Sequence, residues 1–390
     1  MKTALVYFTK ISKTAGHVGG SEILLFLIIK ELQARGYEVT VALQSGGDVA
    51  NASKDYGVAF DEKRLRVLNL SEKGKVLRVL DRHLKFVWQW RLRRLGPKFD
   101  ICISCANPVD FGRPGIHFIY ILTLDEKFKA YFWQAGNGWK GVKAKLVFAR
   151  DAIIAFLAGV RMSAAIVRDG REVILANSNF AKSCIESYYR GRIHEAFYPP
   201  TIFEPLKKAE SVLQNLDIAY IGRFEPEKRV AEIVEIVRLA RERSGVDFRL
   251  HLAGHCPETA DGEHIRSLVE RYPWANLEGT VVGDAKAAFL ASCSFALHAC
   301  KIEAFGISVT EYLKAGLVPI VPREGGSSEV VGLADLAFDS CNEAADILVR
   351  LAQDKAFYSQ CTAHCLERAK VFSAEAYLLR QEQLMNELGI

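Results

Sequence analysis

The chain has 390 residues, of which 50% are hydrophobic, 25% charged and 10% aromatic. This composition is typical of globular domains and excludes a disordered, collagen-like or coiled-coil protein, and the length allows two or three domains. The net charge of +5 is unevenly distributed: residues 1–200 carry 31 Lys and Arg against 18 Asp and Glu, whereas the remaining residues carry 20 against 28. Two bodies of opposite charge share the chain, which suggests different partners for its halves.

The sequence shows neither a membrane span nor an export signal. The longest apolar runs, at residues 23–29 and 152–160, are shorter than the ~20 residues that a helical span needs. Residues 1–8 form a strand-like run without the long apolar core of a signal peptide. We therefore expect a cytoplasmic protein.

The nine cysteines lie mostly in apolar, strand-like segments, which predicts buried, reduced thiols. Cys102 and Cys105 have a spacing found in metal sites. However, alternate strand residues point to opposite faces, and no second pair or nearby histidine completes a ligand set. No metal site is predicted.

Strand-like segments alternate with helical patterns along the chain, which predicts parallel sheets with crossover helices. A helix is expected over residues 20–35. Another is expected over residues 374–388, with Ser373 as its N-cap. Pro199 and Pro200 precede a polar stretch that we interpret as the domain linker. The predicted strands are 3–8, 37–43, 99–106, 115–122 and 172–176, then 217–221, 248–253, 276–282, 294–299 and 318–321.

Loops that follow strands carry the candidate site residues, because open parallel sheets bind ligands at the carboxyl ends of their strands. The first such loop contains Gly19 and Gly20 and opens a helix. Small residues let a ligand approach the backbone, and a helix N-terminus offers amides to an anion. The alternative is a glycine-rich turn that only connects strand and helix.

The loop after the first strand of the second half contains Gly222, Arg223 and Lys228. Two cations at the ligand-binding edge of an acidic domain indicate a phosphate or diphosphate ligand. The alternative is that they pair with Glu225 and Glu227 in a solvated surface network.

A later loop is the most specific, because Glu303 and Glu311 lie eight residues apart around a predicted helix start. If this helix begins near Phe305, the amides of Phe305, Gly306 and Ile307 form an anion site, with Glu303 just outside it and Glu311 nearly two turns in. Carboxylates repel phosphate, so they fit hydroxyl groups of a sugar and a ribose better. The alternative is a glutamate that complements the helix dipole and an exposed helical one.

The loop at residues 324–329 adds a further amide-rich turn, so three strand ends can converge on one diphosphate-bearing ligand. Together these loops resemble the donor-binding domain of retaining GT-B glycosyltransferases of family 4. The family motifs E-x7-E, G-R-x4-K and G-G-x-x-E match residues 303–311, 222–228 and 325–329. The first half is similar through residues 19–22, 176–180 and 198–200.

The resemblance implies an α/β protein with the GT-B fold, in which two Rossmann-like, doubly wound domains face a central cleft. Residues 1–200 would form the acceptor-binding domain and residues 201–372 the donor-binding domain. In the family the C-terminal helix returns to the first domain, and residues 373–390 are placed to do so. Arg229 stands where the family commonly has a glycine.

The resemblance also implies individual roles. Arg223 and Lys228 would bind the donor diphosphate, Glu303 the sugar hydroxyls and Glu311 the ribose. His117 is similar to the first-domain histidine that faces the transferred sugar in some members, and a structural histidine is the alternative. The family retains the configuration of the sugar. No DxD cluster lies near these loops, so we expect cations and helix amides to stabilise the leaving diphosphate without a metal or other cofactor.

Residues 63–98 hold 12 Lys and Arg against two acidic residues, interleaved with Phe86, Trp88 and Trp90. A helix over residues 73–95 would place cations beside aromatic side chains, as at an anionic membrane surface. Nucleic acid would also suit such a patch, and a solvated helix with its aromatics in the core is the third possibility. For a glycosyltransferase, a peripheral position on the inner face of the membrane is the better interpretation.

The sequence thus favours a metal-independent hexosyltransferase that uses a nucleotide-diphosphate sugar and a lipid-linked, lipopolysaccharide or other glycan acceptor. Residues 298–316 are most similar to mannosyltransferases that use GDP-mannose, and a UDP-sugar such as UDP-glucose is the alternative donor. An epimerase or phosphorylase of the same architecture, or a non-catalytic nucleotide-sugar-binding subunit, are the competing functions.

Overall fold

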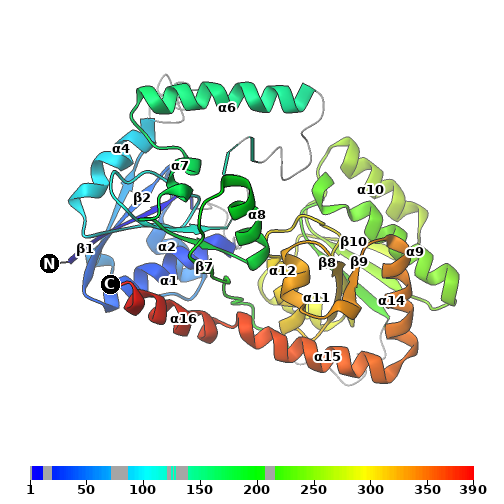
Figure 1. Ribbon diagram of the computed structural model, residues 1–390. Coiled ribbons are helices and arrows are strands. Elements are labelled where there is room, and N and C mark those ends of the chain that lie inside the picture. The colour runs from blue at the N-terminus through cyan, green and yellow to red at the C-terminus, as the bar shows by residue number, and fades with distance from the viewer. Residues whose placement is uncertain are drawn as a thin grey trace. The chain divides into compact units, whose positions relative to one another are not determined.

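The computed structural model describes residues 2–11, 20–71, 87–120, 124–125, 127–128, 139–206 and 216–390. The chain divides into two compact units (Figure 1). Unit 1 comprises Met1–Pro199 and Leu378–Ile390, and unit 2 comprises Pro200–Tyr377. The division falls at the two prolines. The linker that we interpret at residues 204–215 follows them, and residues 207–215 of it lie outside the described ranges.

In unit 1, the described strands form one seven-stranded parallel sheet in the order β3-β2-β1-β4-β5-β6-β7. The chain builds outward from β1 to β3 and then returns to the other side of β1, so the strand order reverses between β1 and β4. Ligands bind at such switch points in open α/β sheets. The strands are β1 (Lys2–Phe8), β2 (Tyr37–Leu43), β3 (Leu65–Asn69), β4 (Ile101–Ser104), β5 (Ile116–Ile119), β6 (Val173–Ala176) and β7 (Glu195–Ala196).

Helices connect these strands and cover both faces of the sheet, with α1 on one side and α4 and α7 on the other (Figure 1). Right-handed crossovers in opposite directions from β1 require this arrangement. Both sheet faces are covered, which explains why β1 and β2 are almost continuously apolar. The described helices are α1 (Gly20–Ala34), α2 (Val49–Asp55), α4 (Val87–Leu95), α6 (Trp139–Leu157), α7 (Ser163–Arg168) and α8 (Asn179–Tyr189).

Unit 2 repeats the plan with a six-stranded parallel sheet, among the described residues, in the order β10-β9-β8-β11-β12-β13. Its switch point lies between β8 and β11. The strands are β8 (Asp217–Ile221), β9 (Arg249–Ala253), β10 (Ala275–Gly279), β11 (Phe295–Leu297), β12 (Val318–Pro322) and β13 (Ala337–Phe338). The helices are α9 (Val230–Ser244), α10 (Ala260–Arg271), α11 (Gly283–Ala291), α12 (Ile307–Lys314), α13 (Gly326–Val331), α14 (Cys341–Gln353) and α15 (Lys355–Ala369). The final helix, α16 (Ala374–Glu387), begins in unit 2 and continues into unit 1. The prediction of two doubly wound α/β domains is confirmed.

The last helix, α16, ends in unit 1, as predicted. The hydroxyl of Ser373 accepts a hydrogen bond from the amide of Ala376 at 3.1 Å and so caps the helix start. Further along, Arg380 pairs with Glu195 at 2.5 Å, and the side-chain amide of Gln381 donates to the carbonyl of Leu27 at 3.3 Å. These contacts attach the end of the chain to α1 and β7.

All nine cysteines are free, which agrees with the prediction of reduced thiols. Burial raises the pKa of Cys102 to about 12, so this side chain is a protonated thiol at neutral pH. No helix among the described residues is both long enough and apolar enough to cross a membrane.

The basic segment at residues 63–98 is only partly described, because residues 72–86, including Phe86, lie outside the described ranges. In α4, Trp88 is 8% exposed and stacks on Tyr7 with ring centroids 5.2 Å apart. The prediction that Trp88 faces a lipid surface is therefore wrong, because its ring belongs to the core. Trp90 is exposed, and the guanidinium of Arg94 lies 4.3 Å from its ring centroid.

Candidate active site

Two buried tyrosines position the loop that follows β8. The hydroxyl of Tyr220 donates to the carbonyl of Arg223 at 3.0 Å, and the hydroxyl of Tyr312 accepts a hydrogen bond from the amide of Ile221 at 2.6 Å. The second tyrosine belongs to α12, so the loop after β8 is attached to the helix that follows β11. The two strand ends at the switch point are thereby held together.

Lys228 ends a short 3₁₀ turn in this loop, and Arg229 then adopts a left-handed backbone with φ 52° before α9 begins. Only glycine adopts this conformation readily. This left-handed backbone explains why the family that the sequence resembles commonly has a glycine at this position. In this chain the position is occupied by Arg229, whose guanidinium pairs with Glu232.

The helix after β11 begins at Ile307, two residues later than predicted. Gly306 has a φ of 96°, which no helical residue can have, so the amides of Phe305 and Gly306 precede the helix instead of forming its first turn. The Phe305 side chain is buried, with its ring 5.5 Å from that of Phe372. Glu311 consequently lies little more than one turn into α12.

Glycine at position 326 lets the loops after β11 and β12 touch. The amide of Gly326 donates to the carbonyl of Glu303 at 2.7 Å. A Cβ atom at Gly326 would lie 2.2 Å from the carbonyl oxygen of Ala304, so a larger residue would force the loops apart. The G-G-x-x-E segment thus fixes the backbone that carries Glu303.

The central contact of this site is an ion pair between Lys228 and Glu303. The ammonium nitrogen lies 2.5 Å from Oε2 of the carboxylate, and the two side chains are 18% and 19% exposed. Burial opposes ionisation of Glu303, but the neighbouring His298 ring and the Lys228 ammonium outweigh it and lower the pKa of Glu303 to about 2. Both partners are therefore charged at neutral pH.

His298, Cys300 and Glu303 form a group whose potential ligand atoms all lie within 4.8 Å of one another. Burial raises the pKa of Cys300 to about 11, so its sulfur is a protonated thiol at neutral pH. The Glu303 carboxylate already faces the Lys228 ammonium. The group is better described as the surroundings of an ion pair than as a metal centre.

Glu311 has a cationic partner that sequence reasoning missed. Lys286, on α11, places its ammonium nitrogen 2.6 Å from Oε1 of Glu311, with both side chains mostly buried. Lys286 is the lysine of α11 and is followed by five apolar residues, a signal that could have indicated a paired cation. Each glutamate of the E-x7-E motif thus has its own lysine.

The structure does not bring Arg223 to this ion pair. Its guanidinium is 70% exposed and pairs with Glu225 at 2.6 Å, as the surface-network alternative predicted. The amide of Gly222 donates to the carbonyl of Ala253 at 3.0 Å. The assignment of Arg223 to a diphosphate stays a prediction.

In unit 1, Gly20 begins α1, whereas Gly19 lies outside the described residues. His117 lies within β5, not at its carboxyl end, and is fully buried. Its Nε2 is 3.1 Å from Glu172, and its ring stacks on Phe111 at 5.5 Å. This geometry favours the structural alternative, so contact of His117 with a transferred sugar stays a prediction that the observed burial does not support.

Residues 203–363 match the sequence model of the family described as glycosyl transferases group 1. This range lies within unit 2 and includes both glutamates and both of their lysines. Most of unit 2 therefore matches the glycosyl transferases group 1 model.

Two curated relatives are similar to parts of the chain. An uncharacterised glycosyltransferase, YqgM of Bacillus subtilis, is 22% identical over 206 residues, which cover 50% of this chain and 55% of the relative. A protein of Candida glabrata named GDP-Man:Man(3)GlcNAc(2)-PP-Dol alpha-1,2-mannosyltransferase is 28% identical over 170 residues, which cover 40% of this chain and 34% of the relative. The chain thus spans about half or less of these relatives.

Solved structures show the same fold over the whole length. Anabaena HepE in complex with UDP and glucose has a TM-score of 0.67 at 13% identity and covers 99% of this chain and 100% of its own. WaaG, described as a glycosyltransferase involved in lipopolysaccharide biosynthesis, has a TM-score of 0.65 at 14% identity, with 96% and 98% covered. The chain therefore has the fold of GT-B glycosyltransferases.

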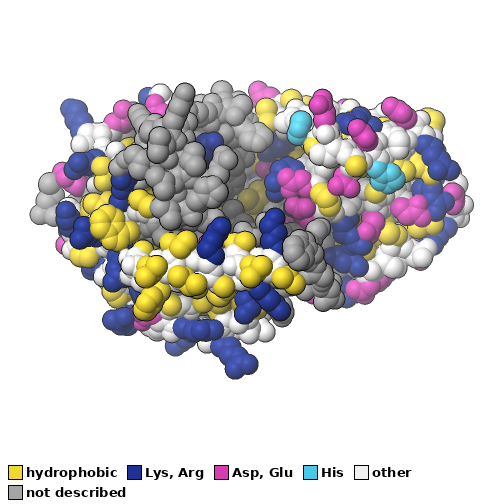
Figure 2. Space-filling model, turned by 90° about the horizontal axis from the view of Figure 1, so that it is seen from above, with side chains coloured by type: hydrophobic (Ala, Val, Ile, Leu, Met, Phe, Trp, Pro, Cys, Tyr) yellow, Lys and Arg dark blue, Asp and Glu magenta, His cyan; other side chains and the backbone are white. Residues whose placement is uncertain are grey.

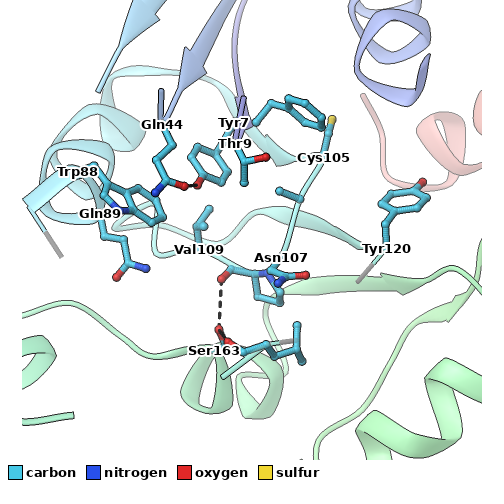
Figure 3. Close-up of a pocket in the computed structure, with 14 residues that line it drawn as sticks. Tyr7, Thr9, Gln44, Trp88, Gln89, Cys105, Asn107, Val109, Tyr120 and Ser163 are labelled. Carbon is cyan, nitrogen blue, oxygen red and sulfur yellow. Dashed lines mark hydrogen bonds between the residues drawn. The ribbon is translucent and has the colours of Figure 1, made fainter. Parts of the chain in front are cut away.

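Unit 1 contains a pocket of about 220 Å³. It opens where β1 and β4 end, at the switch point of this sheet, and Figure 3 shows side chains from β1, α4, the loop after β4 and α7 around it. Ser104 shapes the loop by donating to the carbonyl of Asn107 at 2.9 Å. Sequence reasoning missed this pocket, because its residues come from six separate segments without a motif.

The pocket combines aromatic rings with neutral polar groups. Tyr7 and Trp88 stack along one wall, and the Tyr7 hydroxyl donates to Oε1 of Gln44 at 3.3 Å. Oε1 of Gln89 is buried without a hydrogen-bond partner. No charged residue is among the described side chains that line the pocket. Aromatic faces beside amide groups suit an uncharged ligand with several hydroxyl groups.

Proposed function

We propose that this chain is a retaining glycosyltransferase that moves a hexose from a nucleotide-diphosphate sugar to a glycan acceptor. The observation that carries the proposal is the ion pair of Lys228 and Glu303 at 2.5 Å, at the switch point of unit 2. The pair places a cation, which can bind a diphosphate, beside a carboxylate, which can bind the hydroxyl groups of a sugar.

The charges of the reaction match these residues. Breaking the anomeric bond leaves negative charge on the departing diphosphate and positive charge on the sugar. Lys228 and the amides at the start of α12 would stabilise the diphosphate, while Glu303, ionised because of its low pKa, would accept hydrogen bonds from sugar hydroxyls. Glu311, held by Lys286, would bind the ribose. These groups supply the charge stabilisation without a metal ion.

Mannose from GDP-mannose is the donor we favour. Similarity to the Candida glabrata protein, whose name specifies GDP-Man, supports it, as does similarity to proteins of the same name from Caenorhabditis elegans and Mus musculus. A UDP-sugar is the second candidate, because HepE has been solved with UDP-glucose.

The pocket of unit 1 is our candidate for the acceptor site. It offers aromatic faces and neutral amides, so the group that enters it would be an uncharged sugar of a glycan. Phosphate or lipid parts of a lipid-linked or lipopolysaccharide acceptor would then lie outside the pocket, against the basic surface of this unit.

Changing Glu303 to glutamine tests the donor site. We expect GDP to bind the wild type and the Glu303→Gln variant equally, whereas GDP-mannose should bind the variant about 10- to 100-fold more weakly, because a charge-assisted hydrogen bond to a hydroxyl contributes about 1.5–3 kcal/mol. Titration calorimetry with GDP, GDP-mannose, UDP and UDP-glucose measures this. Equal GDP-mannose affinity in both proteins would refute the sugar-binding role of Glu303, and stronger binding of UDP-glucose would identify a UDP-sugar as the donor.

A second substitution tests the acceptor pocket. The buried Oε1 of Gln89 lacks a partner, so replacing Gln89 with leucine should leave the melting temperature unchanged or raise it. The KM for the glycan acceptor should rise about 3- to 10-fold, the loss expected for one hydrogen bond, with the donor KM unchanged. Gln383→Leu, at an exposed position of α16, is the matched control. An unaltered acceptor KM in Gln89→Leu would argue against this pocket.

A further inference from the structure

Helix α6 carries an exposed apolar stripe that none of the groups above uses. Five of its large hydrophobic side chains are exposed, with fractions from 48% for Val142 to 84% for Phe156; the others are Leu146, Ile153 and Leu157. Figure 2 shows hydrophobic side chains gathered in a band along one side of the molecule, with Lys and Arg side chains beside it.

The stripe is a regular feature of the helix. At 100° per residue, positions 142, 146, 149, 153, 156 and 157 fall within an arc of about 100°. Away from the stripe, Ala155 is buried against Val160 in the turn that follows the helix, beside Ile154. The exposed stripe itself is costly in water, and contiguous apolar faces of this kind mark interaction sites.

Cations border the stripe on both sides. On the helical wheel, Lys145 lies at one edge, and Lys143 and Arg150 lie at the other. The acid of this helix, Asp151, lies away from the stripe, where it is 14% exposed and bonded to Arg150 at 2.7 Å. The arrangement is that of a helix lying in a membrane interface, with apolar side chains below the headgroups and cations level with them.

We propose that α6 binds the surface of an anionic lipid bilayer, with Val142, Leu146, Ile153, Phe156 and Leu157 inserted at the level of the upper acyl chains. The positive charge on both edges of the stripe favours an anionic bilayer over a second copy of the chain. A two-fold contact between two copies of the chain would bring the lysines of both copies together, whereas anionic headgroups neutralise cations on both edges at once. The proposal needs no donor or acceptor and stands apart from the glycosyl-transfer function.

Vesicle flotation of the full chain tests the proposal. The wild type should float with vesicles of equal parts phosphatidylcholine and phosphatidylglycerol, and bind pure phosphatidylcholine at least about tenfold more weakly. Phe156→Ser with Leu157→Ser should lower binding to the anionic vesicles at least about tenfold. Lys143→Glu with Lys145→Glu should lower it similarly and leave the weak binding to phosphatidylcholine unchanged.

The control is Leu366→Ser with Leu379→Ser, which removes two hydrophobic side chains from other helices that are 48% and 58% exposed, and it should float like the wild type. All substituted side chains are exposed, and circular dichroism verifies the fold. Flotation of the Phe156→Ser, Leu157→Ser variant at the wild-type level would overturn the proposal. The proposal would also be overturned if the wild type bound both vesicle types equally. It would be overturned as well if the wild type did not bind vesicles and instead formed dimers that these two substitutions dissociate.

Discussion

Replacing Lys228 with methionine is expected to reduce hexose transfer at least about 100-fold, equivalent to about 2.7 kcal/mol of transition-state stabilisation. Lys228 is the mostly buried cation next to Glu303, and removing a preorganised donor from developing negative charge typically costs this much. Methionine preserves the length and apolar character of the side chain. The rate is measured as released nucleoside diphosphate with saturating donor and acceptor.

Two further proteins make the result specific. Lys370→Met alters a lysine that is 72% exposed and should leave the rate unchanged. Lys228→Arg keeps the charge but replaces a compact ammonium with a larger planar group, so its rate should lie between those of the wild type and Lys228→Met. A Lys228→Met rate within about threefold of the wild type would remove this residue from the mechanism.

The Asp110→Asn substitution is expected to have the largest effect on stability. The Asp110 side chain is fully buried and lies 3.2 Å from Arg93 and 3.1 Å from Arg161; Arg161 also pairs with Glu172 at 2.8 Å. Asparagine leaves both guanidinium groups without this countercharge. We expect the free energy of unfolding to fall by about 2–4 kcal/mol, less than the about 3–5 kcal/mol of a fully buried pair because both arginines keep contact with water.

The pH dependence of this effect has a defined sign. Burial opposes ionisation of Asp110, but hydrogen bonds and the charge of Arg161 outweigh it and lower the pKa of Asp110 below its usual value. A lowered folded-state pKa stabilises the fold above the unfolded pKa of about 3.9 and ceases to do so as the pH falls through the folded value. The difference between wild type and Asp110→Asn should therefore be complete at pH 7 and shrink below about pH 4.

Denaturant unfolding of both proteins across this pH range measures the effect. Asp335→Asn is the control, since Asp335 forms an exposed pair with Arg350, and it should cost less than about 1 kcal/mol. If the two variants were equally stable at pH 7, the buried charge network would not be the source of stability that its geometry indicates.

The fold was predictable because it depends on regular patterns. Alternating strand and helix segments predicted the two sheets, and Ser373 predicted the start of the returning helix. The observed bounds differ from the predicted ones where a single backbone angle determines the start of a helix. The helix α12 begins at Ile307 because Gly306 has a φ of 96°. The sequence shows that residue 306 is a glycine, but it does not show the φ that this glycine adopts.

The candidate site was predictable only in part. Motif spacing indicated that Lys228 and Glu303 belong to one site, although they lie 75 residues apart. It could not show that Lys286 reaches Glu311, because that contact depends on how α11 packs beside α12. The sequence also could not show which candidate side chains are buried. Lys228 lies inside the site, whereas Arg223 is exposed. His117 and Trp88 are buried in the core. The pocket of unit 1 and the stripe of α6 could be found only from three-dimensional positions.

The central claim is that the site around Lys228 and Glu303 transfers a hexose. Its most direct test incubates the purified chain with GDP-mannose, UDP-glucose or other nucleotide sugars, a panel of neutral glycan acceptors and EDTA, and analyses the products by mass spectrometry and NMR. We predict an acceptor heavier by one hexose in α linkage, one nucleoside diphosphate released per product, and a rate unaffected by EDTA. Tight donor binding without any glycosylated product across the panel would contradict the account and identify a non-catalytic nucleotide-sugar-binding protein.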